Sequence, residues 1–215
     1  MRYLPILLPA LGLFAAPLAM GQDATPAATA SPAAHEPESV KVIMQTELGA
    51  IVLAIEKERA PITAGNFLRY VDQKRLDGVV FYRAMKIDDT EYALVQGGLR
   101  GNPKLVLKPI AHEPTSVTSL SHVSGAISMA RGAPGTATAD FFIVVGDLVT
   151  LDAQPVEQDP LGEMPGYAVF GRVIEGMDTV KSMLELPRSA TAGEGAMKGQ
   201  MLEIPVKILT VRRAP

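Results

Sequence analysis

The chain has 215 residues, of which 47% are hydrophobic and 20% are charged. This composition is typical of a globular protein with one domain of about 150 to 200 residues or two smaller ones, and it excludes collagen-like, coiled-coil and fully disordered chains. With 20 Lys and Arg against 23 Asp and Glu, the net charge is -3. The chain therefore lacks the broad basic surface that binding to nucleic acid or anionic lipid requires.

The chain contains no Cys, which excludes thiol nucleophiles, disulfides, iron–sulfur clusters and thiolate zinc sites. Its three His residues, at His35, His112 and His122, do not recur at the spacing of metal ligands. We therefore expect no metal and no other cofactor. Because the charge excludes nucleic acid and anionic lipid, we expect the partners to be small molecules or peptides.

The first 21 residues predict a secretion signal. Residues 3–20 carry no charge, follow Arg2 and end in Ala-Met-Gly at Gly21, a small-x-small pattern typical of cleavage before Gln22. A retained transmembrane anchor is the alternative, but three prolines interrupt the segment and no basic cluster follows it. We expect a periplasmic protein that has no stable insertion in the membrane once residues 1–21 are removed.

Residues 22–38 predict a disordered linker. They are rich in Ala, Pro, Thr and Ser, and they cannot bury enough apolar surface to offset the entropy that ordering would cost. The composition changes at Ser39, where an apolar segment begins, and no comparable linker follows before the end of the chain. We therefore predict one folded domain, residues 39–215.

The domain begins with a predicted β-hairpin and a helix. Residues 40–46 and 50–56 are apolar, partly β-branched runs, and they are joined by a short connection that contains Gly49. A helix is predicted to begin at Pro61, because apolar residues through Val71 then recur at helical spacing. Asp77 and Gly78 end this pattern.

The rest of the domain predicts strands with one further helix. Met177, Val180, Met183 and Leu184 share one face of a predicted helix over residues 176–186. Eight strands and two helices without regular alternation predict a mainly β fold, a closed eight-stranded antiparallel barrel capped by two α-helices. The six further strands are predicted at residues 79–84, 93–96, 125–130, 141–145, 168–173 and 205–211.

The common catalytic motifs do not occur. The glycine-rich residues 97–101 lack the Gly-Lys-Ser/Thr ending of a phosphate loop, and Ser128 lacks the G-x-S-x-G frame of a serine hydrolase. His112 and His122 lie in a polar, turn-rich stretch, which predicts solvated side chains rather than a general base. The neighbouring Glu113 is predicted to be a surface charge.

Four segments nevertheless stand in an informative order. The chain resembles the cyclophilins, whose peptidyl-prolyl isomerases carry F-H-R, F-M-x-Q-G-G, G-x-x-S-M-A and Q-F-F-I segments in this order. The resemblance extends over nearly all of residues 39–211, and it implies the same eight-stranded barrel with two helices and, as is common in the family, a monomer. The corresponding segments here are Phe-Tyr-Arg at 81–83, Leu-Val-Gln-Gly-Gly at 94–98, Gly-Ala-Ile-Ser-Met-Ala at 125–130 and Asp-Phe-Phe-Ile at 140–143.

The resemblance implies a binding site for proline-containing chains. Arg83 is the expected catalytic donor, because a guanidinium stays charged and presents several rigidly held N–H groups. Gln96 is expected to hold the substrate backbone or to steady this arginine, and Phe142 to form an apolar floor for the proline ring. The other residues expected to contact substrate are Tyr82, Leu94, Met129, Ala130, Arg131, Asp140, Leu151 and Tyr167.

Two departures from the family pattern bear on activity. Ala93 replaces an aromatic residue, so one wall of the proline pocket is expected to be missing. Asp140 replaces a glutamine, and its carboxylate is expected to pair either with Arg83, where it would compete with substrate, or with Arg131. Two functions therefore remain: an exported isomerase that accelerates folding by binding unfolded X-Pro segments, or a binding module that has lost most of its turnover.

Overall fold

The computed structural model describes residues 38–87, 90–155, 158 and 164–215. The predicted signal segment, residues 1–21, and the predicted linker up to residue 37 lie outside the described residues. Within the described part of the chain, no helix is both long enough and apolar enough to cross a membrane.

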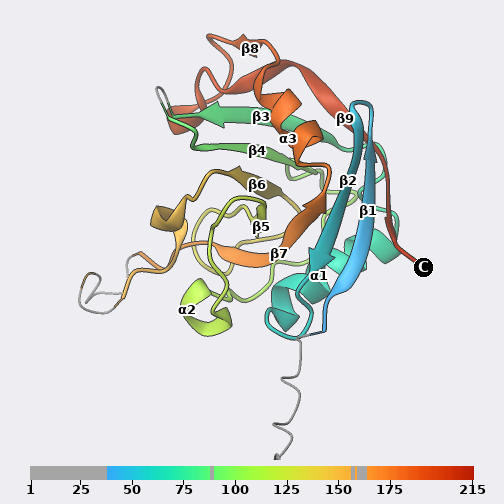
Figure 1. Ribbon diagram of the computed structural model, residues 1–215, viewed down its shortest axis with the longest axis vertical. Coiled ribbons are helices and arrows are strands. Elements are labelled where there is room, and N and C mark those ends of the chain that lie inside the picture. The colour runs from blue at the N-terminus through green and yellow to red at the C-terminus, as the bar shows by residue number, and fades with distance from the viewer. Residues whose placement is uncertain (1–37, 88–89, 156–157, 159–163) are drawn as a thin grey trace, which may run out of the picture. The chain divides into compact units, whose positions relative to one another are not determined.

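The described residues form a closed antiparallel barrel (Figure 1). Eight strands pair in a ring, and a short ninth strand, β8 (Arg188–Ser189), pairs with β9 outside it. The mainly β fold with an eight-stranded barrel is therefore confirmed. Around the ring, the strands follow the order β1 (Val40–Thr46), β2 (Gly49–Ile55), β7 (Ala168–Glu175), β5 (Ala126–Met129), β6 (Phe141–Val145), β4 (Ala93–Gly98), β3 (Val80–Lys86) and β9 (Met201–Arg213), which returns to β1.

Both predicted helices are present. They are α1 (Pro61–Asp72), with its proline in the first turn, and α3 (Met177–Leu184), which buries Val180, Met183 and Leu184 against the barrel. The structure adds a third helix, α2 (Thr115–Thr118), which is too short to produce a periodic pattern in the sequence. In Figure 1, α1 lies near the lower end of the barrel and α3 near the upper end.

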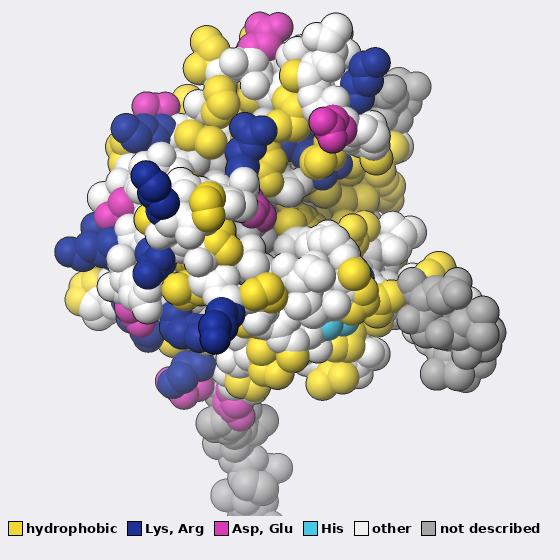
Figure 2. Space-filling model, turned by 180° about the vertical axis from the view of Figure 1, so that it is seen from behind, with side chains coloured by type: hydrophobic (Ala, Val, Ile, Leu, Met, Phe, Trp, Pro, Cys, Tyr) yellow, Lys and Arg dark blue, Asp and Glu magenta, His cyan; other side chains and the backbone are white. Residues whose placement is uncertain are grey.

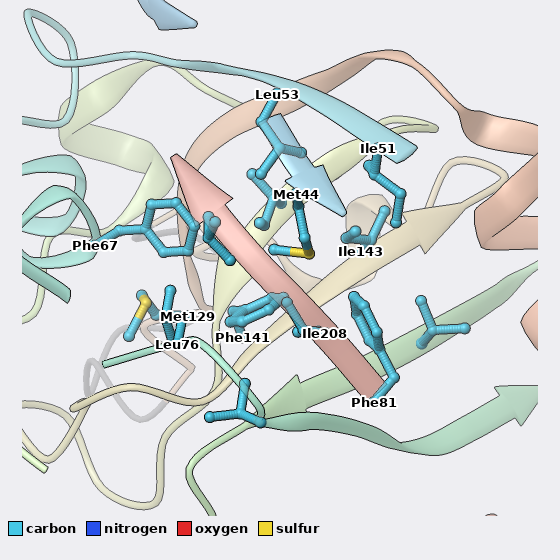
Figure 3. Packing of buried hydrophobic residues seen from close by; sticks show 14 of the residues in the cluster. Met44, Ile51, Leu53, Phe67, Leu76, Phe81, Met129, Phe141, Ile143 and Ile208 are labelled. Atoms are coloured by element: carbon cyan, nitrogen blue, oxygen red, sulfur yellow. The ribbon is translucent and has the colours of Figure 1, made fainter. Parts of the chain in front are cut away.

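Aromatic and aliphatic side chains fill the barrel interior (Figure 3). The ring of Phe141 meets the rings of Phe67 and Phe81 edge to face, at centroid distances of 5.8 and 5.7 Å. A small barrel packed in this way leaves no room for a ligand inside. Because side chains alternate along a strand, the next residue, Phe142, points to the outer surface of the barrel. A ligand must therefore bind on that outer surface.

Glu113 is buried, so the prediction of a surface charge is wrong. Its side chain has 6% of its surface exposed, and its two carboxylate oxygens accept hydrogen bonds from the backbone N–H groups of Ile62 (3.2 Å) and Thr63 (2.9 Å). Ala60, which precedes the helix, provides no side-chain cap. The carboxylate thus satisfies N–H groups that the first turn of α1 leaves without partners.

Candidate active site

A hollow of about 940 Å³ opens on the outer surface of the barrel. Its floor comes from β3 and β4, and its walls come from the loop between β5 and β6 and from residues 192–197 before β9. Figure 2 shows an indentation on one side of the molecule, lined partly by hydrophobic side chains. The predicted residues that line this hollow are Tyr82, Arg83, Gln96, Ala130, Arg131, Asp140 and Tyr167.

The guanidinium of the half-buried Arg83 is held by two amide side chains. Its Nε donates to Oε1 of Gln200 at 2.8 Å, and its Nη1 donates to Oε1 of Gln96 at 2.7 Å, while Nη2 lies 3.8 Å from the sulfur of Met85. Burial lowers the pKa of Arg83, but a guanidinium in a protein keeps its charge. Its remaining N–H groups are available to a ligand in the hollow.

Gln96 continues this network away from the guanidinium. Its Nε2 donates to the hydroxyl of Tyr82 at 2.8 Å, and this hydroxyl donates to Oδ1 of Asp140 at 3.1 Å. The same carboxylate oxygen accepts a hydrogen bond from the backbone N–H of Arg100 at 3.0 Å. Burial raises the pKa of Asp140, and burial together with the nearby Asp140 raises the pKa of Tyr82. One hydrogen-bonded chain therefore links four side chains, from Arg83 to Asp140.

Both partners expected for Asp140 are wrong. It forms no ion pair with Arg83 or with Arg131 in the described part of the chain, because its Oδ1 faces Tyr82 and the backbone N–H of Arg100. Arg131 instead donates to the carbonyl of Gly166 and lies 4.9 Å above the Tyr167 ring. Among the described residues, the guanidinium of Arg83 thus has no carboxylate partner that would compete with substrate.

An apolar cluster borders the hollow. Phe142 and Leu94, with 4% and 7% of their surfaces exposed, belong to it. The rings of Phe142 and Tyr167 pack edge to face at a centroid distance of 5.5 Å. Tyr167 also lines the hollow. Phe142 therefore lies beneath the exposed surface of the cluster rather than in the lining of the hollow. The side chains packed over the buried members are Met85, Leu120, Ala130, Leu151 and Tyr167.

The structure places Met129, an expected substrate contact, away from the hollow. It pairs with Phe141 across β5 and β6, and paired residues on neighbouring antiparallel strands point to the same face. Both side chains therefore enter the barrel interior, where Met129 has 1% of its surface exposed (Figure 3). Ala93 also belongs to this interior cluster, so its small side chain does not remove a wall from the outer site.

Sequence reasoning did not find Gln200. It lies 117 positions after Arg83, and the antiparallel pairing of β3 with β9, in which Arg83 stands opposite Met201, brings the two side chains together. No motif around Gln200 signals this contact. Strand pairing over such a separation is a property of the whole barrel and not of a local segment.

His122 is fully buried, so the prediction of a solvated histidine is wrong. Its ring stacks on Phe142 at 5.8 Å, with Nδ1 2.5 Å from Oδ1 of Asp152 and Nε2 2.9 Å from the hydroxyl of Ser128. Burial lowers the pKa of His122, which favours a neutral ring that donates to Asp152 and accepts from Ser128. This is the residue set of a serine hydrolase, but Ser128 has no exposed surface that a substrate could reach. The ring of His122 in this buried set packs against the rings of Phe142 and Tyr167.

In the described ranges, no group of three or more His, Asp and Glu side chains is arranged to hold a metal ion. The charged groups of the hollow are instead held by amides, a hydroxyl and backbone groups, as described above for Arg83 and Asp140.

Comparisons with known proteins agree with this architecture. The family model for cyclophilin type peptidyl-prolyl cis-trans isomerases matches residues 41–212. A peptidyl-prolyl cis-trans isomerase of Acinetobacter baylyi is 35% identical over 83% of this chain and 88% of its own length. Peptidyl-prolyl cis-trans isomerase cyp18 of Streptomyces antibioticus is 32% identical over 80% of this chain and 96% of its own length.

Solved structures share the fold. A Cryptosporidium parvum cyclophilin type peptidyl-prolyl cis-trans isomerase superposes with a TM-score of 0.61 and 18% identity, over 83% of this chain and 99% of its own. A second structure of that protein, determined in the presence of the dipeptide Ala-Pro, gives a TM-score of 0.60. The chain belongs to the cyclophilin-type peptidyl-prolyl cis-trans isomerases.

The buried His122 predicts a stability that depends on pH. Because its pKa in the folded protein lies below the ordinary value of 6.5, the unfolded chain takes up a proton first as the pH falls. The contribution of His122 to the free energy of unfolding is therefore fully present above pH 6.5 and decreases as the pH falls through the lowered pKa. Urea unfolding of the wild type and of His122→Gln between pH 5 and pH 8 measures this contribution. Equal pH slopes in the two proteins would contradict the assignment.

Proposed function

We propose that the hollow and the adjoining apolar cluster catalyse rotation about X-Pro peptide bonds, with Arg83 as the donor. The observation that carries this proposal is the guanidinium of Arg83, held by Gln96 and Gln200, free of a carboxylate among the described residues and bordered by apolar side chains. A charged donor beside an apolar surface matches the chemistry of a proline amide, which has a polar nitrogen in an apolar ring.

The reaction requires no covalent intermediate. Rotation about a peptide bond has a barrier of about 20 kcal/mol, because the twisted amide loses the conjugation between nitrogen and carbonyl. The twisted proline nitrogen regains its lone pair and accepts a hydrogen bond that the planar amide accepts poorly. A fixed donor therefore stabilises the transition state more than the ground state. An acceleration of about 10⁵ requires about 7 kcal/mol, which is within reach of one charged donor in a partly desolvated site.

The apolar cluster supplies the surface for the proline ring. Tyr167 and Leu151 are partly exposed and form the face that the ring meets, while Phe142 and Leu94 lie beneath them. His122 stacks on Phe142, lies edge to face with Tyr167, and keeps the Phe142 ring in place. Burial of the pyrrolidine ring against these side chains, together with the amide of Gln96, would orient the X-Pro bond toward the guanidinium.

The substrates are proposed to be proline-containing segments of unfolded or extended polypeptides, bound by a monomer. The Cryptosporidium parvum relative studied with Ala-Pro supports this substrate class. The alternative, a binding module with little turnover, was based on Ala93 and on an Asp140–Arg83 pair. The interior position of Ala93 and the separate partners of Asp140 favour the isomerase over this alternative.

The proposed place of action is the bacterial periplasm, where the protein would assist the folding of exported proteins. The support is the sequence alone: an uncharged segment over residues 3–20 and a small-x-small pattern before Gln22. Expression of the full chain in a Gram-negative host, followed by cell fractionation and N-terminal sequencing, tests this. A periplasmic protein that begins at Gln22 is the expected result. A cytoplasmic protein with residues 1–21 intact would contradict the proposal.

Replacement of Arg83 tests the proposed catalysis. Arg83→Ala removes the donor, so kcat/KM for isomerisation of a proline peptide should fall about 10- to 1,000-fold, which corresponds to about 1.4 to 4 kcal/mol. Arg83→Lys keeps the charge but presents its donors from one atom rather than from a rigid planar fork, and it should also lose activity. The matched control is Arg213→Ala, because Arg213 pairs with Asp72 away from the hollow. Wild-type rates in both Arg83 variants would overturn the assignment.

A further inference from the structure

Several hydrogen bonds hold the carboxylate of Asp140 at the edge of the hollow. Its Oδ1 accepts hydrogen bonds from the Tyr82 hydroxyl and from the backbone N–H of Arg100, and the backbone N–H of Gly101 adds a further contact. Gly98 approaches it so closely that a Cβ there would lie 2.6 Å from the same oxygen. The carboxylate is therefore fixed in one position, although it does not reach the guanidinium of Arg83.

The groups at the two ends set the direction of the hydrogen-bonded chain, because a guanidinium only donates and an ionised carboxylate only accepts hydrogen bonds. An ionised carboxylate only accepts hydrogen bonds, so the Tyr82 hydroxyl must donate to it. The phenolic oxygen is then left as an acceptor, and only the NH₂ group of Gln96 can donate to it. That orientation turns the carbonyl oxygen of Gln96 toward Nη1 of Arg83.

The opposite orientation of Gln96 would disturb Arg83. If its amide were turned over, its NH₂ group would face the guanidinium, and two donors would meet at a distance of 2.7 Å. Gln200 would still hold Nε, but Nη1 would have lost its acceptor. The carboxylate of Asp140 thus favours, from the far end of the chain, the same orientation of Gln96 that the donor-only guanidinium requires.

We propose that Asp140 is a positioning residue for the isomerase, and that it acts through Tyr82 and Gln96 to hold the guanidinium of Arg83 in its catalytic orientation. The proposal rests on the function proposed above for Arg83. Neither Asp140 nor Tyr82 is required to touch the reacting bond. Their contribution is the preorganisation of a donor whose alignment determines how well the twisted amide is stabilised.

The proposal implies a dependence on pH. The titratable and charged groups that act on Asp140 are Tyr82 from β3 and Arg100 after β4. Tyr70 from α1 is affected by the charge of Asp140, but its hydroxyl is neutral on the acid side and does not alter this titration. Burial outweighs the hydrogen bonds and raises the pKa of Asp140 above its ordinary value of 3.8. As the pH falls through this raised pKa, the carboxyl group takes up a proton and becomes a donor itself. It then no longer supports the orientation of Gln96 from the far end of the chain, and kcat/KM should fall.

The first test removes the connection at Tyr82. Tyr82→Phe in the full chain keeps the ring but loses the hydroxyl, so kcat/KM should fall by about tenfold, mainly in kcat, and the loss of activity on the acid side should disappear. The matched control is Tyr70→Phe, another buried tyrosine, whose hydroxyl accepts a hydrogen bond from Leu107 on the α1 side of the barrel. It should lower thermal stability to a similar extent and leave kcat/KM and its pH profile unchanged.

The second test uses Asp140→Asn, alone and combined with Tyr82→Phe. An amide can donate or accept, so the single variant should lose activity and its acid dependence, and the double variant should be no slower than the slower single variant. Additive losses, or a wild-type acid dependence in Tyr82→Phe, would overturn the positioning role. Arg83→Ala separates the two claims. If Arg83→Ala is inactive while Tyr82→Phe keeps wild-type behaviour, only the positioning role fails. If Arg83→Ala is fully active, the proposed function of Arg83 fails.

Discussion

The structure depends on one constraint: a guanidinium must be held firmly at a surface without being neutralised. A carboxylate partner would hold Arg83 most strongly, but it would also occupy the donors that a twisted amide needs. The protein uses the uncharged amide oxygens of Gln96 and Gln200 instead. Neutral acceptors leave the positive charge available to the substrate. The nearest carboxylate in this network, that of Asp140, lies two hydrogen bonds beyond Gln96.

The barrel supplies that geometry. Gln96 stands directly opposite Arg83 on β4, and Gln200 comes just before β9, the other neighbour of β3. The two amides therefore reach the same guanidinium from the two neighbours of β3, one from within β4 and one from the residue before β9, which the closed ring holds in register. Because the interior is filled by rings such as Phe141, alternation sends Phe142 outward, where the apolar cluster forms beside Arg83. The alternation of side chains along β6 therefore determines both the packing of the core and the position of the apolar cluster at the site.

The sequence predicted the barrel, because alternation along each strand is a local property, and the resemblance to the cyclophilins, carried by four short segments, predicted seven residues that line the hollow. The sequence did not predict the wall that residues 192–197 form. It did not predict partners. Gln200 meets Arg83 through strand pairing across 117 positions, Asp140 bonds to Tyr82 rather than to an arginine, and Met129 turns inward because it pairs with Phe141. His122 and Glu113 lie in a polar stretch, yet both are buried, since each finds hydrogen-bond partners from distant segments.

The central claim is that Arg83 donates a hydrogen bond to the proline nitrogen. A crystal structure of the protein with a bound X-Pro peptide tests this most directly. The account predicts that the pyrrolidine ring lies against Tyr167 and the apolar cluster, with an Nη atom of Arg83 within about 3.5 Å of the proline nitrogen and Gln96 and Gln200 still in contact with the guanidinium. A peptide bound with its proline away from Arg83, or a guanidinium turned out of the hollow by the peptide, would contradict it.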